Sequence, residues 1–133
     1  MKRARPEELL HRELVATLRA TLPKPWLVWH TPNGGGRSKA EAGILKAMGT
    51  LAGMPDLFVL GPNRTLVAIE LKAPPRRLAS GGLSNAAPRL NPAQRALQSD
   101  LGACGVPYLV CDDVGRCLEA LRALGVPVRG RAA

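Results

Sequence analysis

Three charged residues fall within a short and otherwise apolar stretch of the chain. Asp56 begins the apolar run 56–60, and Glu70 and Lys72 follow a Gly-Pro-Asn turn, within and just after the run 65–71. Two apolar runs joined by such a turn predict a β-hairpin. Because side chains alternate along a strand, Glu70 and Lys72 project from one face, whereas Leu71 points to the other face and into the core.

Pairing of the two runs through the turn at 61–64 brings Asp56 towards Glu70. Two neighbouring carboxylates repel each other unless a cation lies between them. A hard divalent ion, Mg²⁺ or Mn²⁺, is the natural partner of such oxygen ligands, and the carbonyl of Leu71 offers another oxygen. Lys72 would then orient water or stabilise a phosphoryl oxyanion, as phosphodiester hydrolysis requires. The alternative is a solvated pair of charges on an exposed strand.

The chain is strongly basic for its size. Its net charge is +9 over 133 residues, and its sequence pI is near 10.5. Such an imbalance favours a polyanionic partner, most often nucleic acid. A composition rich in arginine, alanine, proline and glycine is the alternative source of the charge.

The remaining pattern predicts one mixed α/β domain, 1–133, with a central sheet and helices on its faces. Pro6 begins a helix that Pro23 ends, and glycines end the later helices. Residues 74–92, rich in Pro, Gly, Ser and Asn, predict a long flexible loop, and 126–133 predict a frayed basic tail. The expected helices after the first are 37–49, 92–105 and 114–125, and the expected strands are 26–31, 56–60, 65–71 and 106–112.

Composition also bears on location. No stretch is long and apolar enough to span a membrane, and the N-terminal segment lacks the apolar core of a signal peptide. The three cysteines include no CxxC or paired zinc pattern. They are expected to be free thiols in a reducing cytoplasm.

A second group of polar residues surrounds a glycine-rich loop. The loop 34–36 leads into the N-terminal end of a predicted helix, a place where backbone N–H groups can bind phosphate. Basic side chains on that helix can neutralise DNA phosphates. The alternative is a flexible turn beside a solvated face. The candidate nucleic-acid contacts here are His30, Asn33, Arg37, Lys39 and Lys46.

The combination of these motifs resembles a known nuclease family. Pro55-Asp56 followed by Glu70-Leu71-Lys72 resembles the PD-(D/E)XK signature. The surrounding stretches, HTPNGGGRSKAEAGILKAMGTLAGMPDLFVL, VAIELKAP and LNPAQ, are similar to small stand-alone VRR-NUC proteins of phages and bacteria. The resemblance covers roughly residues 7–124 and implies a restriction-endonuclease-like core, α-β-β-β-α-β, with a mixed central sheet flanked by helices.

The resemblance also implies roles for individual residues. Asp56, Glu70 and the carbonyl of Leu71 would bind Mg²⁺ or Mn²⁺, and Lys72 would be the catalytic lysine. Gln94 would match the family's glutamine near the active site. The implied activity is metal-dependent hydrolysis of DNA, with branched DNA such as Holliday junctions as substrate. The implied setting is a homodimer in the cytoplasm of a bacterium or a phage-infected cell.

An acid on the first helix completes the family's site. Glu7 is the first choice because it lies four residues before His11, where relatives often carry glutamine, and this spacing places both on one helix face. Glu8 and Glu13 are the alternatives. The chain departs from the family pattern at His11 and in its longer segment after Lys72. That segment carries Arg76, Arg77 and Arg89, as a DNA-contacting flap or as an insertion.

Two other functions fit the same residues. A DNA-binding module that keeps the nuclease fold without catalysis is the main alternative, although the intact Asp56, Glu70 and Lys72 count against it. A structural or phage-assembly protein with compositional charge is the other. Salt-dependent DNA binding separates this last reading from the first two.

Overall fold

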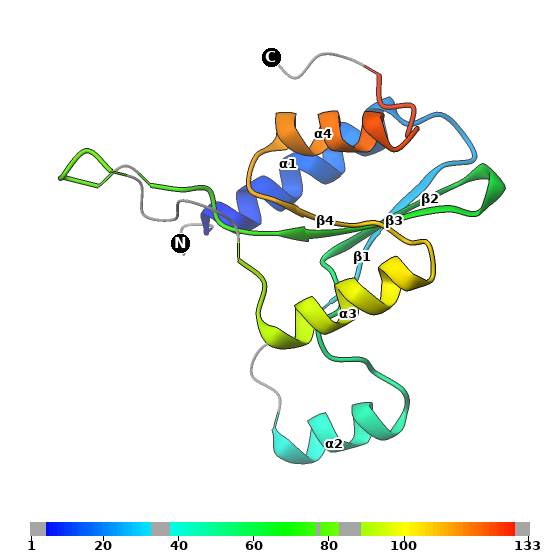
Figure 1. The fold of residues 1–133 in the computed structure, drawn as a ribbon, viewed down its shortest axis with the longest axis vertical. Helices are drawn as coiled ribbons and strands as arrows, with labels where there is room; N and C mark the ends of the chain where they lie inside the picture. The colour runs from blue at the N-terminus through cyan, green and yellow to red at the C-terminus, as the bar shows by residue number, and fades with distance from the viewer. Residues whose placement is uncertain (1–4, 33–37, 77, 83–88, 130–133) are drawn as a thin grey trace.

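The fold is a four-stranded sheet covered by helices on both faces (Figure 1). The computed structural model describes residues 5–32, 38–76, 78–82 and 89–129. Its order matches the expected α-β-β-β-α-β core, with α2 and α4 added. The elements are α1 (Pro6–Thr21), β1 (Leu27–His30), α2 (Lys39–Ala47), β2 (Leu57–Gly61), β3 (Thr65–Leu71), α3 (Pro92–Ala103), β4 (Tyr108–Cys111) and α4 (Val114–Ala123), with a 3₁₀ turn at Pro62–Arg64.

Most elements are shorter at their ends than the sequence pattern predicted. β4 begins only at Tyr108, after Pro107, which has no N–H to give to a ladder. α2 begins at Lys39, because the Ser38 side chain accepts a hydrogen bond from the N–H of Glu41 (3.1 Å) and caps the helix. Asp56 lies just before β2 rather than within it.

The strands lie in the order β1-β2-β3-β4. The first three are antiparallel, whereas β4 runs parallel to β3 and is reached through α3. Leu57 pairs with Ile69 in the β2–β3 ladder. Continuing this register by one residue places Asp56 opposite Glu70, at the edge where β3 ends.

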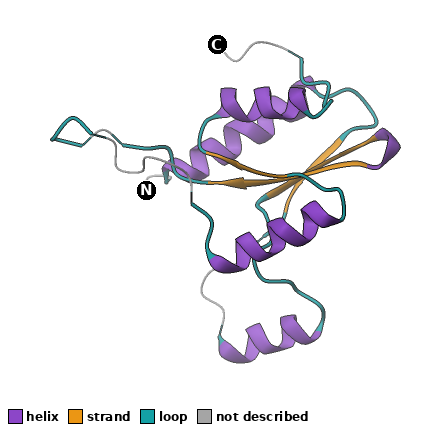
Figure 2. Ribbon diagram, viewed as in Figure 1, coloured by secondary structure: helices purple, strands orange, loops and turns teal. Residues whose placement is uncertain are grey.

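One face of the sheet packs on α1 and α4 (Figure 2). Successive turns of α1 contribute Leu10, Leu14 and Leu18, at the spacing of a single helix face. Alternate strand residues meet them, and together they form the larger apolar core. Its strand members are Leu57, Val59, Val67, Ile69, Leu71 and Cys111.

The opposite face packs on α3 and holds a smaller apolar cluster. Phe58, Ala68 and Tyr108 project from three neighbouring strands and pack against Leu97 of α3. Glu70, two residues after Ala68, projects from this same face of β3. It is the buried charged residue of the described chain, with 3% of its surface exposed.

Two segments stand apart from the expected pattern of burial. α2 buries none of its residues and lies beyond α3, away from the sheet (Figure 1). The expected frayed tail is wrong in its first part, because Val126 (2% exposed) and Val128 (7%) are buried in the larger core. Their alternation turns both side chains inward, and the Val128 carbonyl accepts a hydrogen bond from Nε of Arg122 (3.3 Å). Residues 130–133 lie outside the described part.

The described parts of the predicted loop, 74–76, 78–82 and 89–91, contain no helix or strand. A short turn closes where the N–H of Leu78 donates to the carbonyl of Gly82 (2.7 Å). The three cysteines are free thiols, as predicted. Among the described residues, every helix is too short or too polar to cross a bilayer.

Candidate active site

The ends of several elements meet at one side of the sheet. The C-terminal end of β3 and the N-terminal ends of α1 and α3 all lie on this side of the molecule (Figure 1). Asp56 enters this region just before β2, and Glu70 and Lys72 enter it from β3. These are the positions where the sequence predicted a pair of carboxylates and a lysine.

Asp56 is held from two sides. Its carboxylate Oδ2 accepts a hydrogen bond from the N–H of Leu71 at 2.7 Å. Its main-chain carbonyl accepts two more, from the N–H of Thr31 at 2.8 Å and from Nδ1 of His30 at 2.9 Å. A carbonyl can only accept, so His30 carries its proton on Nδ1. The aspartate is therefore fixed by β1 through its backbone and by β3 through its side chain.

Gln94 connects Glu70 to Lys72. Its side-chain amide donates through Nε2 to Oε2 of Glu70 at 2.8 Å. Its Oε1 accepts from Nζ of Lys72 at 3.1 Å. One amide thus binds the carboxylate and the ammonium together, in the orientation that each requires.

The start of α3 fixes this glutamine. Asn91 and Gln94 form a capping box: the Asn91 side chain accepts from the Gln94 N–H (2.8 Å), and Gln94 Oε1 accepts from the Asn91 N–H (3.0 Å). The same oxygen therefore caps the helix and holds Lys72. The main-chain N–H of Lys72 also donates to the Cys111 carbonyl (2.9 Å), which anchors the residue to β4.

The electrostatics show that the two carboxylates are strongly coupled. Burial, followed by a hydrogen bond with Asp56 and the charge of Asp56, raises the pKa of Glu70 to about 8. Lys72 opposes this effect and the charge of Glu7 adds to it. At neutral pH Glu70 consequently keeps its proton, as a buried carboxyl beside another carboxylate does without a cation between them.

This pair suits a hard divalent ion. Mg²⁺ binds through one or two carboxylates and keeps several waters. Within the described residues, no group of three or more His, Cys, Asp or Glu side chains is placed to hold a metal. Asp56 and Glu70 would hold a bound ion, and the Leu71 carbonyl and water would offer further oxygens. The donor set fits magnesium or manganese better than zinc, which favours nitrogen and sulfur ligands.

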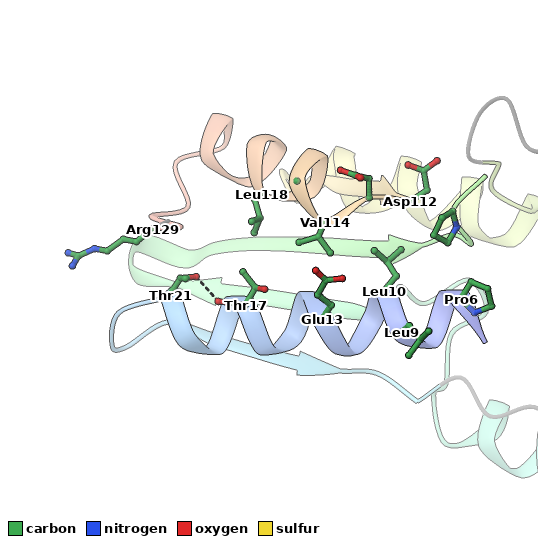
Figure 3. Close-up of a pocket in the computed structure, with 13 residues that line it drawn as sticks. Pro6, Leu9, Leu10, Glu13, Thr17, Thr21, Asp112, Val114, Leu118 and Arg129 are labelled. Carbon is green, nitrogen blue, oxygen red and sulfur yellow. Dashed lines mark hydrogen bonds between the residues drawn. The ribbon is translucent and has the colours of Figure 1, made fainter. Parts of the chain in front are cut away.

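The three acids of α1 lie in different surroundings. The charge of Glu7 reaches Glu70 and contributes to its raised pKa. Glu8 is paired with Arg12 at 2.7 Å, on the exposed side of the helix. Glu13 projects into a groove of about 650 Å³ between α1 and α4 (Figure 3). Glu7 therefore has the best position of the three, and its role as a ligand stays a prediction.

His11 was not foreseen as a contact of the site. Its ring packs edge-on against His30, with ring centroids 4.5 Å apart. Burial lowers the pKa of His11, the charge of His30 lowers it further, and Asp56 opposes both. His11 thus packs against His30, which in turn holds Asp56. Its position four residues after Glu7 was the available signal.

Tyr108 is a second residue that the sequence did not single out. Its hydroxyl donates to the Gly53 carbonyl at 3.1 Å. Burial, and then the charges of Glu70 and Asp56, raise the pKa of this hydroxyl far above its ordinary value, so it remains a donor. The bond ties the segment before Asp56 to β4. A buried tyrosine in a strand gives no signal of such a role.

The expected nucleic-acid contacts are only partly visible. His30 lies at the site, whereas Lys39 and Lys46 are exposed on α2, and Arg76 is exposed beyond β3. Asn33, Arg37 and Arg77 lie outside the described residues. Their predicted contact with DNA remains a prediction.

Two solved structures share this fold. One, described as a VRR_NUC domain protein, is 18% identical, with 99% of each chain covered and a TM-score of 0.66. The other, described as a VRR_NUC domain, is also 18% identical, with 90% of this chain and 97% of the other covered and a TM-score of 0.55. No protein-family model matches the chain, and no curated protein matches it. The restriction-endonuclease-like fold expected from the motifs is confirmed.

Proposed function

We propose that this chain, which has the fold of VRR-NUC domains, is a metal-dependent nuclease that hydrolyses phosphodiester bonds in DNA. The observation that carries the proposal is the pair formed by the buried Glu70 and the partly buried Asp56, held by Gln94 and Leu71 beside the ammonium of Lys72. Burying two adjacent carboxylates is unfavourable for stability, so their position at the sheet edge favours a functional reason for it.

Asp56 and Glu70 would hold Mg²⁺ or Mn²⁺, which supplies Lewis-acid polarisation of the phosphate and a bound water of lowered pKa. Glu70 gives up its proton when it becomes a ligand. Lys72 offsets the negative charge that develops on the phosphate and keeps the attacking water in line. Gln94 holds Lys72 and Glu70 in register, as a hydrogen-bonded partner of a metal ligand does.

The net charge of +9 supports DNA as the substrate. Lys39, Lys46 and Arg76, with Asn33, Arg37 and Arg77, would contact the backbone, and His30 would contact it beside the carboxylates. We further propose branched DNA as the preferred form and a homodimer as the active species. Two-fold symmetry would suit paired cuts across a junction.

A cleavage assay tests the proposal. Wild-type protein is incubated with a four-way junction, a flap and a plain duplex, each in Mg²⁺, Mn²⁺ or EDTA. The matched variants are Lys72→Ala and Lys24→Ala, which removes an exposed lysine from the segment between α1 and β1. We expect metal-dependent cutting by the wild type and Lys24→Ala, reduced at least about 100-fold in Lys72→Ala, the size of one lost charge-stabilising donor.

Other outcomes assign the chain to the alternatives. Salt-sensitive binding of every substrate without cutting would make it a DNA-binding module that keeps a nuclease fold. Absence of both binding and cutting would favour a structural protein whose charge is compositional. Equal cutting of junction and duplex would contradict the preference for branched DNA but support the nuclease activity.

A further inference from the structure

A groove lies beside Gln94, the residue whose side-chain amide binds Glu70. It lies between α2 and the N-terminal end of α3 and has a volume of about 480 Å³, within the range of small-ligand pockets. Gln94 lines the groove and also donates to Glu70 at 2.8 Å. Gln94 is therefore shared by the groove and the candidate active site.

The residues lining this groove combine apolar and cationic chemistry. Leu45, Leu51 and Met54 offer apolar side chains, and Lys46 and Thr50 offer an ammonium and a hydroxyl. Apolar surface accepts the face of a base, whereas an ammonium pairs with phosphate. A nucleotide presents these two features together, and a purely apolar or purely ionic ligand does not.

One wall of the groove is closely packed and the opposite wall is exposed to solvent. A Cβ at Gly53 would collide with the backbone of Ala93 and Gln94, so the segment before Asp56 lies directly against the start of α3. Opposite it, α2 buries no residue, and Leu51, just after that helix, is 60% exposed. The helix thus contributes a wall to the groove rather than side chains to the core.

We infer that this groove receives one unpaired nucleotide of the DNA, adjacent to the phosphodiester bond held at Asp56 and Glu70. The inference rests on the proposed function and adds a requirement on its substrate. A base within a continuous duplex must leave its stack to enter a pocket, and unstacking is least costly for a base that is already unpaired. Bulges, gaps and branch points supply such a base, so the groove selects DNA by local unpairing.

Filling the groove tests this inference, and α2 offers a matched pair of alanines. Ala42 and Ala47 are both exposed, but only Ala42 is among the residues that line the groove. The DNA is a duplex with a single bulged 2-aminopurine, whose emission rises when it leaves the base stack. Binding is measured in EDTA, and a fully paired duplex serves as the reference.

We expect wild type and Ala47→Trp to raise the 2-aminopurine emission and to bind the bulge more tightly than the paired duplex. Ala42→Trp should lose the emission change and at least about tenfold of the preference, the size of one lost base contact. A second pair guards against misfolding. Leu51→Ala, which trims the groove, should weaken the preference, whereas Met48→Ala, outside it and 78% exposed, should not.

Unchanged emission and preference in a folded Ala42→Trp protein would overturn the inference. So would a loss of self-association in Ala42→Trp with nucleotide insertion intact, because the groove would then be an interface between copies. The assay uses no metal, so it is independent of cleavage. Nucleotide insertion without any cutting in Mg²⁺ would support the role of the groove and contradict the nuclease activity. Cutting without insertion would support the nuclease activity and contradict the role of the groove.

Discussion

Successive residues of β3 point to two faces of the sheet that differ in their surroundings. Val67, Ile69 and Leu71 face α1 and α4 and pack in an apolar core. Ala68 and Glu70 face α3, where the cluster is smaller and ends in the carboxylate pair. Ile69 and Glu70 are neighbours in sequence and both are buried, yet the Ile69 side chain packs in an apolar core whereas the Glu70 side chain binds Gln94.

Along this one strand, the residues on one face contribute to the stability of the fold and those on the other face form the candidate active site. The face that packs against α1 and α4, here called the closed face, provides most of the buried apolar area, which drives folding. The other face can then hold two coupled carboxylates whose burial opposes folding. The polar side chains are kept in place by helix caps and backbone hydrogen bonds rather than by core packing. Changes on the two faces should therefore have different readouts.

The largest expected effect on stability comes from the closed face. Ile69→Ala leaves a cavity beside α1 and α4, since Ile69 is fully buried there. We expect the free energy of unfolding to fall by about 2–5 kcal/mol, measured by urea denaturation. Cleavage per folded molecule should be nearly unchanged. A large loss of cleavage with full stability would contradict the division between the faces.

On the other face, Gln94→Ala removes the amide that connects Glu70 to Lys72. We expect cleavage to fall by about 10–100-fold, the usual effect of losing a partner of a metal ligand, with a much smaller loss of stability than in Ile69→Ala. Gln98→Ala is the matched control, because Gln98 lies on the same helix and donates to the Tyr108 carbonyl (3.1 Å) rather than to Glu70. Equal activity losses in both variants would show that α3 acts through its packing alone.

The stability of the wild type and of Glu70→Gln, which replaces the carboxyl by an uncharged amide of the same shape, should depend differently on pH. The folded-state pKa of Glu70 is raised to about 8 from 4.5, so its contribution is fully present below pH 4.5 and is lost as the pH rises through 8. In EDTA, the wild type should lose stability relative to Glu70→Gln between these values. Thermal unfolding across pH 4–9 measures the difference. Parallel curves would mean that the pKa of Glu70 is not raised in the folded protein.

The smallest expected effect compares two helix caps, one on each face. Asn91 caps α3 and Asp113 caps α4 through equivalent bonds to N–H groups, of 2.8 Å and 2.9 Å. Replacing either by alanine should lower the free energy of unfolding by about 1 kcal/mol. Only Asn91→Ala should also lower cleavage, because Asn91 positions Gln94. Cleavage assays at equal folded protein separate the two, and equal activity of both variants would contradict the positioning role.

The strand pair that carries the site followed from the sequence for a simple physical reason. Alternation fixes which face each residue occupies, and a short turn fixes the register. Together these brought Asp56 towards Glu70 and turned Leu71 into the core. The start of α3 also followed from the sequence, since Asn91 followed by Pro92 is typical of a helix N-cap and first helical position.

Contacts between distant elements could not be predicted in the same way. His11 meets His30 only because α1 crosses the sheet at one particular place, which local patterns do not specify. The bond from Tyr108 to Gly53 joins residues 55 positions apart. Val126 and Val128 looked like a tail because two valines among basic residues give too little periodicity to indicate burial. Each of these contacts depends on tertiary packing.

Calorimetric titration of Mn²⁺ tests the central claim that Asp56 and Glu70 form a metal-binding pair. Wild type and Glu70→Gln are titrated at pH 7 in two buffers of different ionisation enthalpy. Because the pKa of Glu70 is raised to about 8, Mn²⁺ binding should release a proton from the wild type, and its heat should depend on the buffer. Glu70→Gln should bind far more weakly and release none. Equal binding by both proteins, or no binding by the wild type, would contradict the claim.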